Sequence, residues 1–246
     1  MKTKHLAKFM SRAAHLEADI ELADVIKISS NSGKLHTPGA ALLFDDISAQ
    51  QHPRLAARAN SSSARRHALN HLKATLGASY IKEMYEDLYI YLQAILYGAA
   101  RKGLDPARLV GEHKVTIEAN DLLKAGSWPA VVQIVTNSIF RRLENEKSTK
   151  ELIQKIDAKL NLGIPAAVLH AALPYLEMRH LLIHADGIAD QKFCNDFPAV
   201  GATVGAKIDI GYGTATQARA AIFDLVKEID ERVVANDLLP ATEIQP

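Results

Sequence analysis

The sequence lacks the residues that mark several classes of protein. Among its 246 residues there is one cysteine, Cys194, so neither a disulfide framework nor a cysteine-based zinc site can form within the chain. Thirteen glycines and nine prolines exclude collagen-like and low-complexity chains. A hydrophobic content of 48% also separates the chain from disordered proteins. After these exclusions the sequence predicts an ordinary globular protein, with one large domain or one domain and an extension.

Long apolar runs are also missing from the sequence. No window approaches the roughly 20 apolar residues that a membrane-spanning helix needs. Acidic residues interrupt the first segment before any stretch reaches the length of a signal peptide, at Glu17, Asp19, Glu21 and Asp24. Together with the single cysteine, these features predict a cytoplasmic protein that does not enter a membrane.

The chain as a whole has almost no net charge, but its two ends carry opposite net charges. The 29 Lys and Arg residues nearly balance 28 Asp and Glu residues, which excludes broad, non-specific binding to nucleic acid. Residues 1–76, however, carry a net charge of +5, whereas residues 151–246 carry −5. The basic segment predicts RNA contacts by Arg65, Arg66 and Lys73, although a solvated helix face explains the same residues equally well.

Apolar residues recur mainly at steps of three and four, which is typical of amphipathic helices. The spacing predicts helices over residues 6–25, 78–101, 106–126, 128–143, 149–160, 165–184 and 214–233. Residues 35–53 read as an irregular connection, and the stretch after residue 63 as helical. Pro174 is expected to kink its helix or to begin the next one.

The segment VGAKIDIGYG is the exception, because its short alternation predicts a small β-hairpin or an isolated strand pair before the last helix. Thr214 or Thr216 is expected to cap that helix, and the tail after it to fray. The predicted fold is therefore all-α, with this one hairpin. We expect a helical domain over residues 77–240, preceded by a basic, helical N-terminal extension over residues 1–76.

The densest group of chemically active side chains lies in the segment EMRHLLIHADG. Glu177, His180 and His184 are three and four residues apart, so they share a helix face, as metal ligands on a helix do. A di-metal bundle would need a second Glu-x-x-His helix, which the sequence does not contain, and Leu181 excludes an HEXXH site. No metal is therefore predicted, and a metal-dependent bundle is kept as a third alternative.

Arg179 and His184 support a different interpretation of the same segment. An arginine stabilises the charge of a phosphate, and an imidazole accepts or donates a proton near neutral pH, which are the two functions that metal-free RNA cleavage needs. Five residues rotate an ideal helix by about 140°, so the two side chains do not lie side by side on it. We expect either that the helix end unwinds at Asp186 and Gly187, or that a second chain completes the site.

The segment RHLLIHADGIADQKF, from Arg179 to Phe193, resembles the signature of the HEPN superfamily. In that signature an Arg is followed by a polar residue, here His180, then by three to five residues and a His. The likeness extends over about residues 77–236 and is to the stand-alone RiboL-PSP-HEPN and toxin-like members. It implies a metal-independent endoribonuclease without a cofactor, which acts as a toxin or in defence and has its active centre between the two copies of a homodimer.

The resemblance also implies roles for individual residues. His184 would act as general base or acid on the ribose 2′-hydroxyl and so leave a cyclic phosphate. Arg179 would hold the scissile phosphate, and His180 would orient the pair. Glu86, or else Glu83, would be the acidic residue that several members of the superfamily place near the centre.

One residue departs from the family pattern. Members that pair with a nucleotidyltransferase antitoxin often carry a tyrosine, the target of modification, two residues after the motif His, where this chain has Asp186. Silencing by that route is therefore not expected here. An antitoxin protein is kept as a candidate partner.

A non-catalytic, HEPN-like module that binds a nucleotide, RNA or protein is the alternative to the nuclease. In that case Arg179 would be a structural ion-pair partner, and His184 would cap the helix, favoured by the helix dipole. The sequence also contains tyrosines that could stack on bases, but helix and interface packing explains them better. These are Tyr80, Tyr85, Tyr89, Tyr91 and Tyr97.

Overall fold

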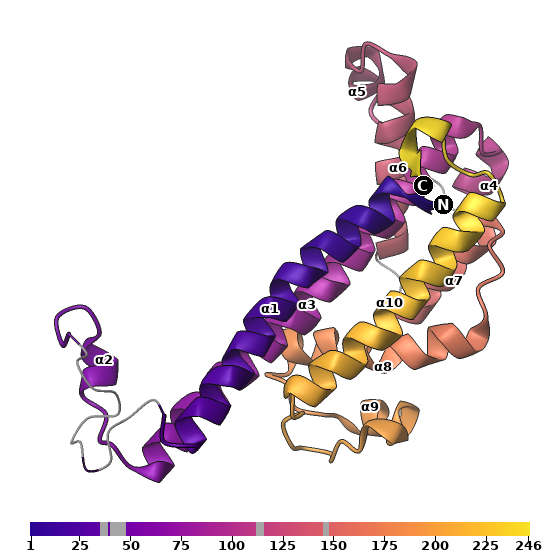
Figure 1. The fold of residues 1–246 in the computed structure, drawn as a ribbon. Coiled ribbons are helices and arrows are strands. Elements are labelled where there is room, and N and C mark those ends of the chain that lie inside the picture. The colour runs from indigo at the N-terminus through magenta and orange to yellow at the C-terminus, as the bar shows by residue number, and fades with distance from the viewer. Residues whose placement is uncertain (35–38, 40–47, 112–115, 145–147) are drawn as a thin grey trace.

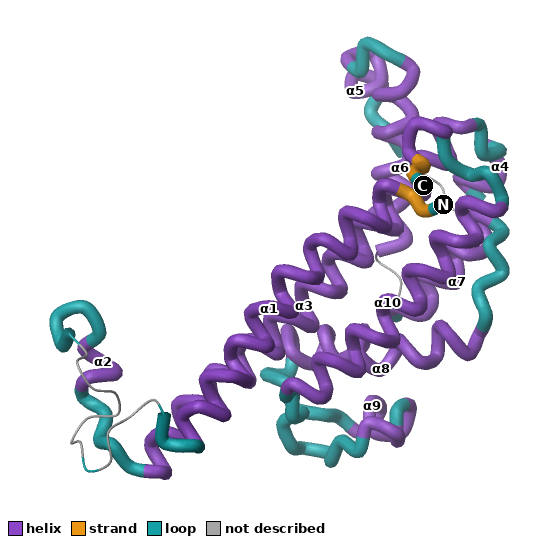
Figure 2. The backbone as a smooth tube through the Cα atoms, in the orientation of Figure 1, coloured by secondary structure: helices purple, strands orange, loops and turns teal. Residues whose placement is uncertain are grey.

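The structure, a computed structural model, describes residues 1–34, 39, 48–111, 116–144 and 148–246. Helices dominate it, and a two-stranded antiparallel sheet joins the chain ends (Figure 1, Figure 2), which confirms the all-α fold class. The α-helices are α1 (Lys4–Asn31), α2 (Pro53–Ala56), α3 (Ser62–Lys102), α4 (Pro106–Val110), α5 (Ala119–Lys124), α6 (Trp128–Glu144), α7 (Thr149–Leu160), α8 (Ala166–His184), α9 (Gln191–Asp196) and α10 (Tyr212–Ala235). The other elements are the 3-10 turns η1 (Pro198–Val200) and η2 (Ala241–Glu243) and the strands β1 (Lys2–Thr3) and β2 (Ile244–Gln245).

Helix α3 supplies the surface on which most other helices pack. It begins at Ser61, whose side chain accepts a hydrogen bond from the Ala64 backbone N–H, and it ends at Gly103, where φ is 108°. Its 41 residues span about 60 Å at 1.5 Å per residue. Helices α1, α6, α7, α8 and α10 all contact it. Within the described residues, no helix is both long and apolar enough to cross a membrane.

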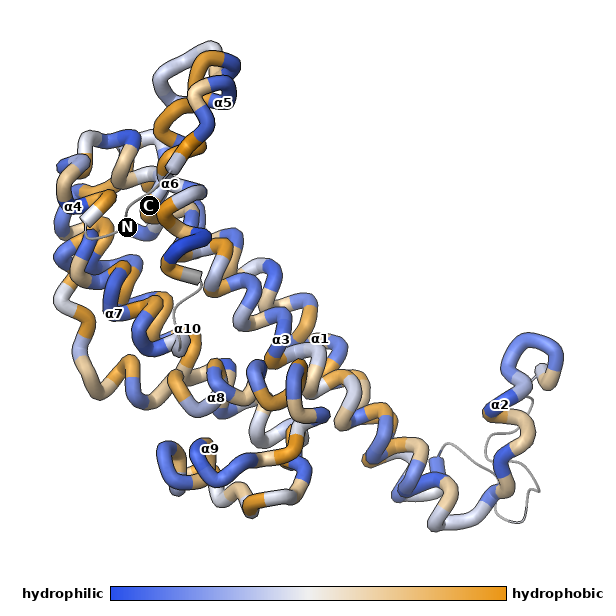
Figure 3. Tube along the Cα trace, turned by 180° about the vertical axis from the view of Figure 1, so that it is seen from behind, coloured by the Kyte–Doolittle hydropathy of each residue, from blue (hydrophilic) through white to orange (hydrophobic). Residues whose placement is uncertain are grey.

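The N-terminal segment packs as part of the bundle. Helix α1 lies along α3, and its Leu6, Phe9 and Ala13 belong to the same hydrophobic core as residues of α3, α8 and α10. The expected boundary between residues 76 and 77 falls inside α3, which is continuous there. Beyond the other helices, α1 and the first part of α3 extend together as a two-helix arm (Figure 1, Figure 3).

Three local predictions differ from the structure. Of the predicted hairpin or isolated strand pair, residues 204–213 form no hairpin among themselves, but Lys207 makes a single antiparallel bridge with Ile188, and Gly205 turns the chain with φ at 78°. The tail does not fray, since β2 pairs with β1. The helix predicted over residues 106–126 is two short helices, α4 and α5, and residues 112–115 between them lie outside the described part of the chain, as does most of the predicted connection 35–53.

The expected caps of the last helix are also wrong. Helix α10 begins after Gly211, earlier than Thr214 and Thr216. The Thr214 hydroxyl donates to the Asp209 carbonyl and the Thr216 hydroxyl to the carbonyl of Tyr212, so neither caps a backbone N–H. Pro174, by contrast, lies inside α8, which continues through it to His184.

A buried carboxylate joins the N-terminus to the helical core. Asp230 of α10, 1% exposed, accepts hydrogen bonds from the Thr3 backbone N–H at 2.9 Å, from the Thr3 hydroxyl, and from the Tyr91 hydroxyl at 3.0 Å. Burial, followed by the charge of Asp230 and its hydrogen bond, raises the pKa of Tyr91. Because three donors from two other elements converge on one carboxylate, Asp230 fixes β1, α3 and α10 together.

Replacing this carboxylate is expected to destabilise the fold. Asp230→Ala leaves the Tyr91 hydroxyl and the Thr3 N–H buried without a partner, which costs about 3–5 kcal/mol. Asp224→Ala, at an exposed position of the same helix, is the matched control and should stay within about 0.5 kcal/mol of wild type. Urea unfolding measures both variants. Equal free energies of unfolding for the two variants would show that the Asp230 network does not stabilise the fold.

Candidate functional site

The candidate site lies at the carboxyl end of α8. His184 is the last residue of this helix, and Ala185 follows as its C-cap. Asp186 and Gly187 then turn the chain with φ at 51° and 76°, and the Gly187 N–H donates to the Leu181 carbonyl at 2.9 Å. Such a turn satisfies a terminal carbonyl of the helix. The Asp-Gly pair therefore ends α8 after His184, as expected for Asp186 and Gly187, but the helix stays regular between Arg179 and His184, so this helix end does not bring the two side chains together.

Arg179 is directed at α3 and held there by two contacts. Its Nη2 lies 3.1 Å from Oε1 of Glu86, and its Cζ lies 4.6 Å from the ring centroid of Tyr85. The Nε atom is buried and has no hydrogen-bond partner, while the whole side chain is still 29% exposed. The structure thus pairs Glu86, rather than Glu83, with Arg179. The ion pair and the cation–π contact fix the guanidinium, while the side chain as a whole remains partly exposed.

His180 and His184 lie together on the exposed part of α8. Their ring centroids are 4.8 Å apart with the planes inclined by 47°, and both residues are exposed. Ile183 lies between them in sequence and is 43% exposed. Two imidazoles beside an exposed isoleucine form a surface that another chain can cover.

One chain does not place Arg179 and His184 side by side. Since α8 is helical from one residue to the other, the rotation of about 140° between them applies. The guanidinium contacts α3, whereas the imidazoles face solvent. Within one chain the guanidinium and the His184 imidazole therefore point in different directions.

Glu177 does not join the histidines as a metal ligand. Its Oε1 accepts a hydrogen bond from the Thr149 backbone N–H at 3.2 Å, at the start of α7. Across the described residues, no three His, Cys, Asp or Glu side chains are grouped as they would be around a metal ion. In this structure the carboxylate of Glu177 therefore stabilises the junction between α7 and α8.

The residues expected to contact RNA lie away from the end of α8. The Arg65 side chain donates to Asn60, Arg66 is exposed, and Lys73 Nζ lies 3.2 Å from Oδ1 of Asp209. Along the continuous helix α3, Lys73 is about 20 Å and Arg66 about 30 Å from Glu86, at 1.5 Å per residue. Within one chain, the three basic residues do not reach the phosphate that Arg179 would bind.

Tyr85 is a partner of Arg179 that the sequence pattern did not predict. Tyr85 is half-buried, and its hydroxyl has a side-chain hydrogen bond with Thr149. Its burial raises its pKa, although the Arg179 guanidinium and that hydrogen bond act in the opposite direction. The signal in the sequence was the position of Tyr85 directly before Glu86, in a helix already predicted to be near the centre.

A cavity of about 530 Å³ was also not predicted. It lies beside α8, the start of α10 and the segment between them, within the size range of small-molecule sites. Its lining includes His170, Tyr175, Lys207 and Gln217. Met178, the neighbour of Arg179, lines the same cavity, so α8 separates this space from the contact between Arg179 and α3.

Comparison with known proteins finds no family, no curated protein and no solved structure that matches this chain.

The raised pKa of Tyr85 predicts how stability depends on alkaline pH. The unfolded chain loses the tyrosine proton near pH 10, whereas the folded chain holds it to higher pH. Stability is therefore fully present below that pH and falls above it, by up to about 1.4 kcal/mol per pH unit for each such group. Tyr85→Phe keeps the ring under Arg179 and removes this contribution, so urea unfolding between pH 9 and 11 should show a shallower loss. Parallel curves for the variant and wild type would contradict the assignment.

Proposed function

We propose that the chain is a metal-independent endoribonuclease of the HEPN type that acts as a homodimer. The observation that supports this most directly is the end of α8, which carries both a partly exposed arginine, fixed by Glu86 and Tyr85, and a pair of exposed, adjacent imidazoles. Arginine suits the charge of a phosphate, and histidine suits proton transfer near neutral pH. These are the groups that cleavage of RNA by its own 2′-hydroxyl requires.

In the proposed reaction, His184 removes the proton of the ribose 2′-hydroxyl. The 2′-oxygen then bonds to phosphorus, and the bond from phosphorus to the 5′-oxygen of the next nucleotide breaks. A second imidazole protonates that oxygen, which leaves a 2′,3′-cyclic phosphate and a 5′-hydroxyl. Arg179 stabilises the negative charge on the phosphoryl oxygens, and His180, 4.8 Å from His184 by ring centroids, holds the orientation of that ring.

The geometry of α8 supports the proposed dimer. The imidazoles face solvent while Arg179 contacts α3, so a second α8 across a two-fold axis would bring an imidazole of one copy toward the guanidinium of the other. Symmetric dimers of this kind are the commonest oligomers. Exposed Ile183 and Ile188 supply apolar area for such an interface.

The basic residues of α3 have a separate role in this proposal. Arg65, Arg66 and Lys73 would contact the phosphates of a longer RNA outside the cleavage centre, since they lie about 20–30 Å along α3 from Glu86. A cytoplasmic location, a role as a toxin or in defence, and an antitoxin as partner belong to the same proposal.

One observation favours a non-catalytic binding module as the second candidate. Arg179 has its ion pair with Glu86 and its contact with Tyr85 already in the single chain, as a purely structural arginine would. A module of this kind would bind RNA, a nucleotide or a protein without turnover. The cleavage experiment below separates the two candidates.

The nuclease proposal predicts cleavage without metal. Purified protein incubated with total RNA in excess chelator should produce fragments ending in cyclic phosphate. Arg179→Ala and His184→Ala should each lower the cleavage rate by about 10²-fold or more, because one loses charge stabilisation and the other proton transfer. Fragment ends are identified by mass spectrometry.

The matched control for this test is His170→Ala. His170 is an exposed histidine of the same helix, so its loss should leave cleavage at the wild-type rate. Absence of cleavage, or equal rates for wild type, Arg179→Ala and His184→Ala, would overturn the catalytic proposal. Binding of RNA without cleavage would favour the non-catalytic module.

The proposed interface predicts that a charge at Ile183 separates the two copies. Ile183→Asp places a carboxylate in the apolar part of the interface, so the dimer should dissociate and cleavage should fall with it. Light scattering after size exclusion measures the mass. Leu123→Asp, at an 84% exposed position of α5, is the control and should remain dimeric and active. A dimeric, fully active Ile183→Asp variant would refute this interface.

A further inference from the structure

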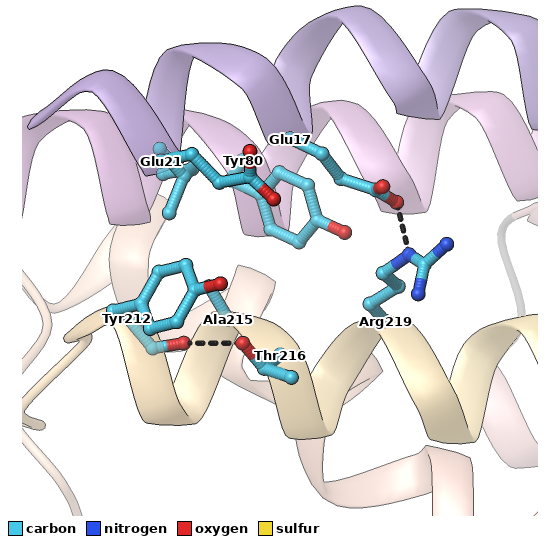
Figure 4. Close-up of a pocket in the computed structure, with 8 residues that line it drawn as sticks. Glu17, Glu21, Tyr80, Tyr212, Ala215, Thr216 and Arg219 are labelled. Atoms are coloured by element: carbon cyan, nitrogen blue, oxygen red, sulfur yellow. Dashed lines mark hydrogen bonds and ion pairs between the residues drawn. The ribbon is translucent and has the colours of Figure 1, made fainter. Parts of the chain in front are cut away.

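A second candidate site lies between α1, α3 and α10. Figure 4 shows a pocket lined by Glu17 and Glu21 of α1, Tyr80 of α3, and Tyr212 and Arg219 of α10. Its volume is about 80 Å³, whereas one water needs roughly 10–15 Å³ of such space. The pocket therefore has room for a group of several heavy atoms.

The Tyr80 hydroxyl is the feature that points to a ligand. Tyr80 is 2% exposed, and its hydroxyl oxygen is buried with no hydrogen-bond partner. Figure 4 shows this side chain extending from α3 into the space between α1 and α10. A buried hydroxyl without a partner costs stability, and a polar group bound in the pocket would satisfy it.

The charges around the pocket select the kind of ligand. Glu17 is paired with Arg219, so these two charges neutralise each other. Among the described residues, Glu21 has no ion-pair partner, and it is exposed at the pocket. The lining thus carries one uncompensated negative charge, next to the rings of Tyr80 and Tyr212.

We propose that this pocket binds a small organic cation that carries a primary ammonium group. The ammonium donates hydrogen bonds to the Glu21 carboxylate and to the Tyr80 hydroxyl oxygen, which now lacks a partner. Tyrosine rings attract cations to their faces, and Tyr212, 42% exposed, forms an aromatic wall at the opening. The short aliphatic part of the ligand lies against Ile20 and Ala215.

The proposed cation site is independent of the proposed nuclease centre. The pocket faces α1 and α10, whereas Glu86 and Tyr85 of the same helix α3 contact Arg179 of α8. Its residues play no part in the cleavage reaction. Binding of a cation can therefore be tested whether or not the chain cleaves RNA.

The test measures binding of three probes of similar size and different charge to the full-length protein. By isothermal titration calorimetry, n-butylammonium should bind saturably at one site per chain, while n-butanol and butyrate should bind at least tenfold more weakly. Glu21→Gln should weaken n-butylammonium binding by at least tenfold. Asp19→Asn, at an exposed position of the same helix outside the pocket, should bind like wild type.

Tyr80→Phe separates a ligand-binding role from a structural one. Removal of an unpartnered hydroxyl should leave the melting temperature of the free protein unchanged or higher, while binding of n-butylammonium weakens at least threefold. A lowered melting temperature with unchanged binding would overturn the role of Tyr80. No saturable binding of n-butylammonium, equal binding of n-butanol, or unchanged binding in Glu21→Gln would overturn the site.

Discussion

The packing of α1, α6, α7, α8 and α10 against α3 determines how the helices of this chain are arranged. Three tyrosines of this helix make three different contacts, because they point to different neighbours. Tyr91 donates to Asp230 and so fixes α10 and the N-terminus, Tyr85 lies under Arg179 of α8, and Tyr80 enters the pocket between α1 and α10. A rigid helix thus sets the positions of both candidate sites. The side chains of each site are held in place because they are attached to a helix that is packed in the hydrophobic core.

The helical part of the fold could be predicted from the sequence because its signal is local. The 3.6-residue period gave the positions of α1, α6, α7 and α8. The errors lie where distant residues decide the structure. The tail is held by pairing of Ile244 with Thr3, a long-range contact that local sequence patterns do not predict. Residues 204–210 alternate like a strand but form only the single bridge from Lys207 to Ile188. Helix α3 is continuous across residues 76 and 77, where the sequence predicted a boundary.

The candidate site was predictable to a different extent for each residue. The spacing of Arg179, His180 and His184 placed them at one helix end, and the structure confirms that location. The sequence could not decide between Glu83 and Glu86, because 93 positions separate Glu86 from Arg179. The ion pair in the folded chain identifies Glu86 as the partner. In the proposed function, Arg179 and His184 act together only across two copies of the chain, and the sequence signals this through the rotation of about 140° between them.

In the proposed function, two copies of α8 meet at the exposed histidines and form one cleavage centre. Disulfide trapping can detect this contact, with Ile183→Cys introduced in a Cys194→Ser background so that residue 183 carries the sole thiol. Because a disulfide requires Cα atoms within about 7 Å, mild oxidation should yield a covalent dimer that still cleaves RNA in excess chelator. A chain that stays monomeric on oxidation, or a covalent dimer without activity that regains it on reduction, would rule out this arrangement.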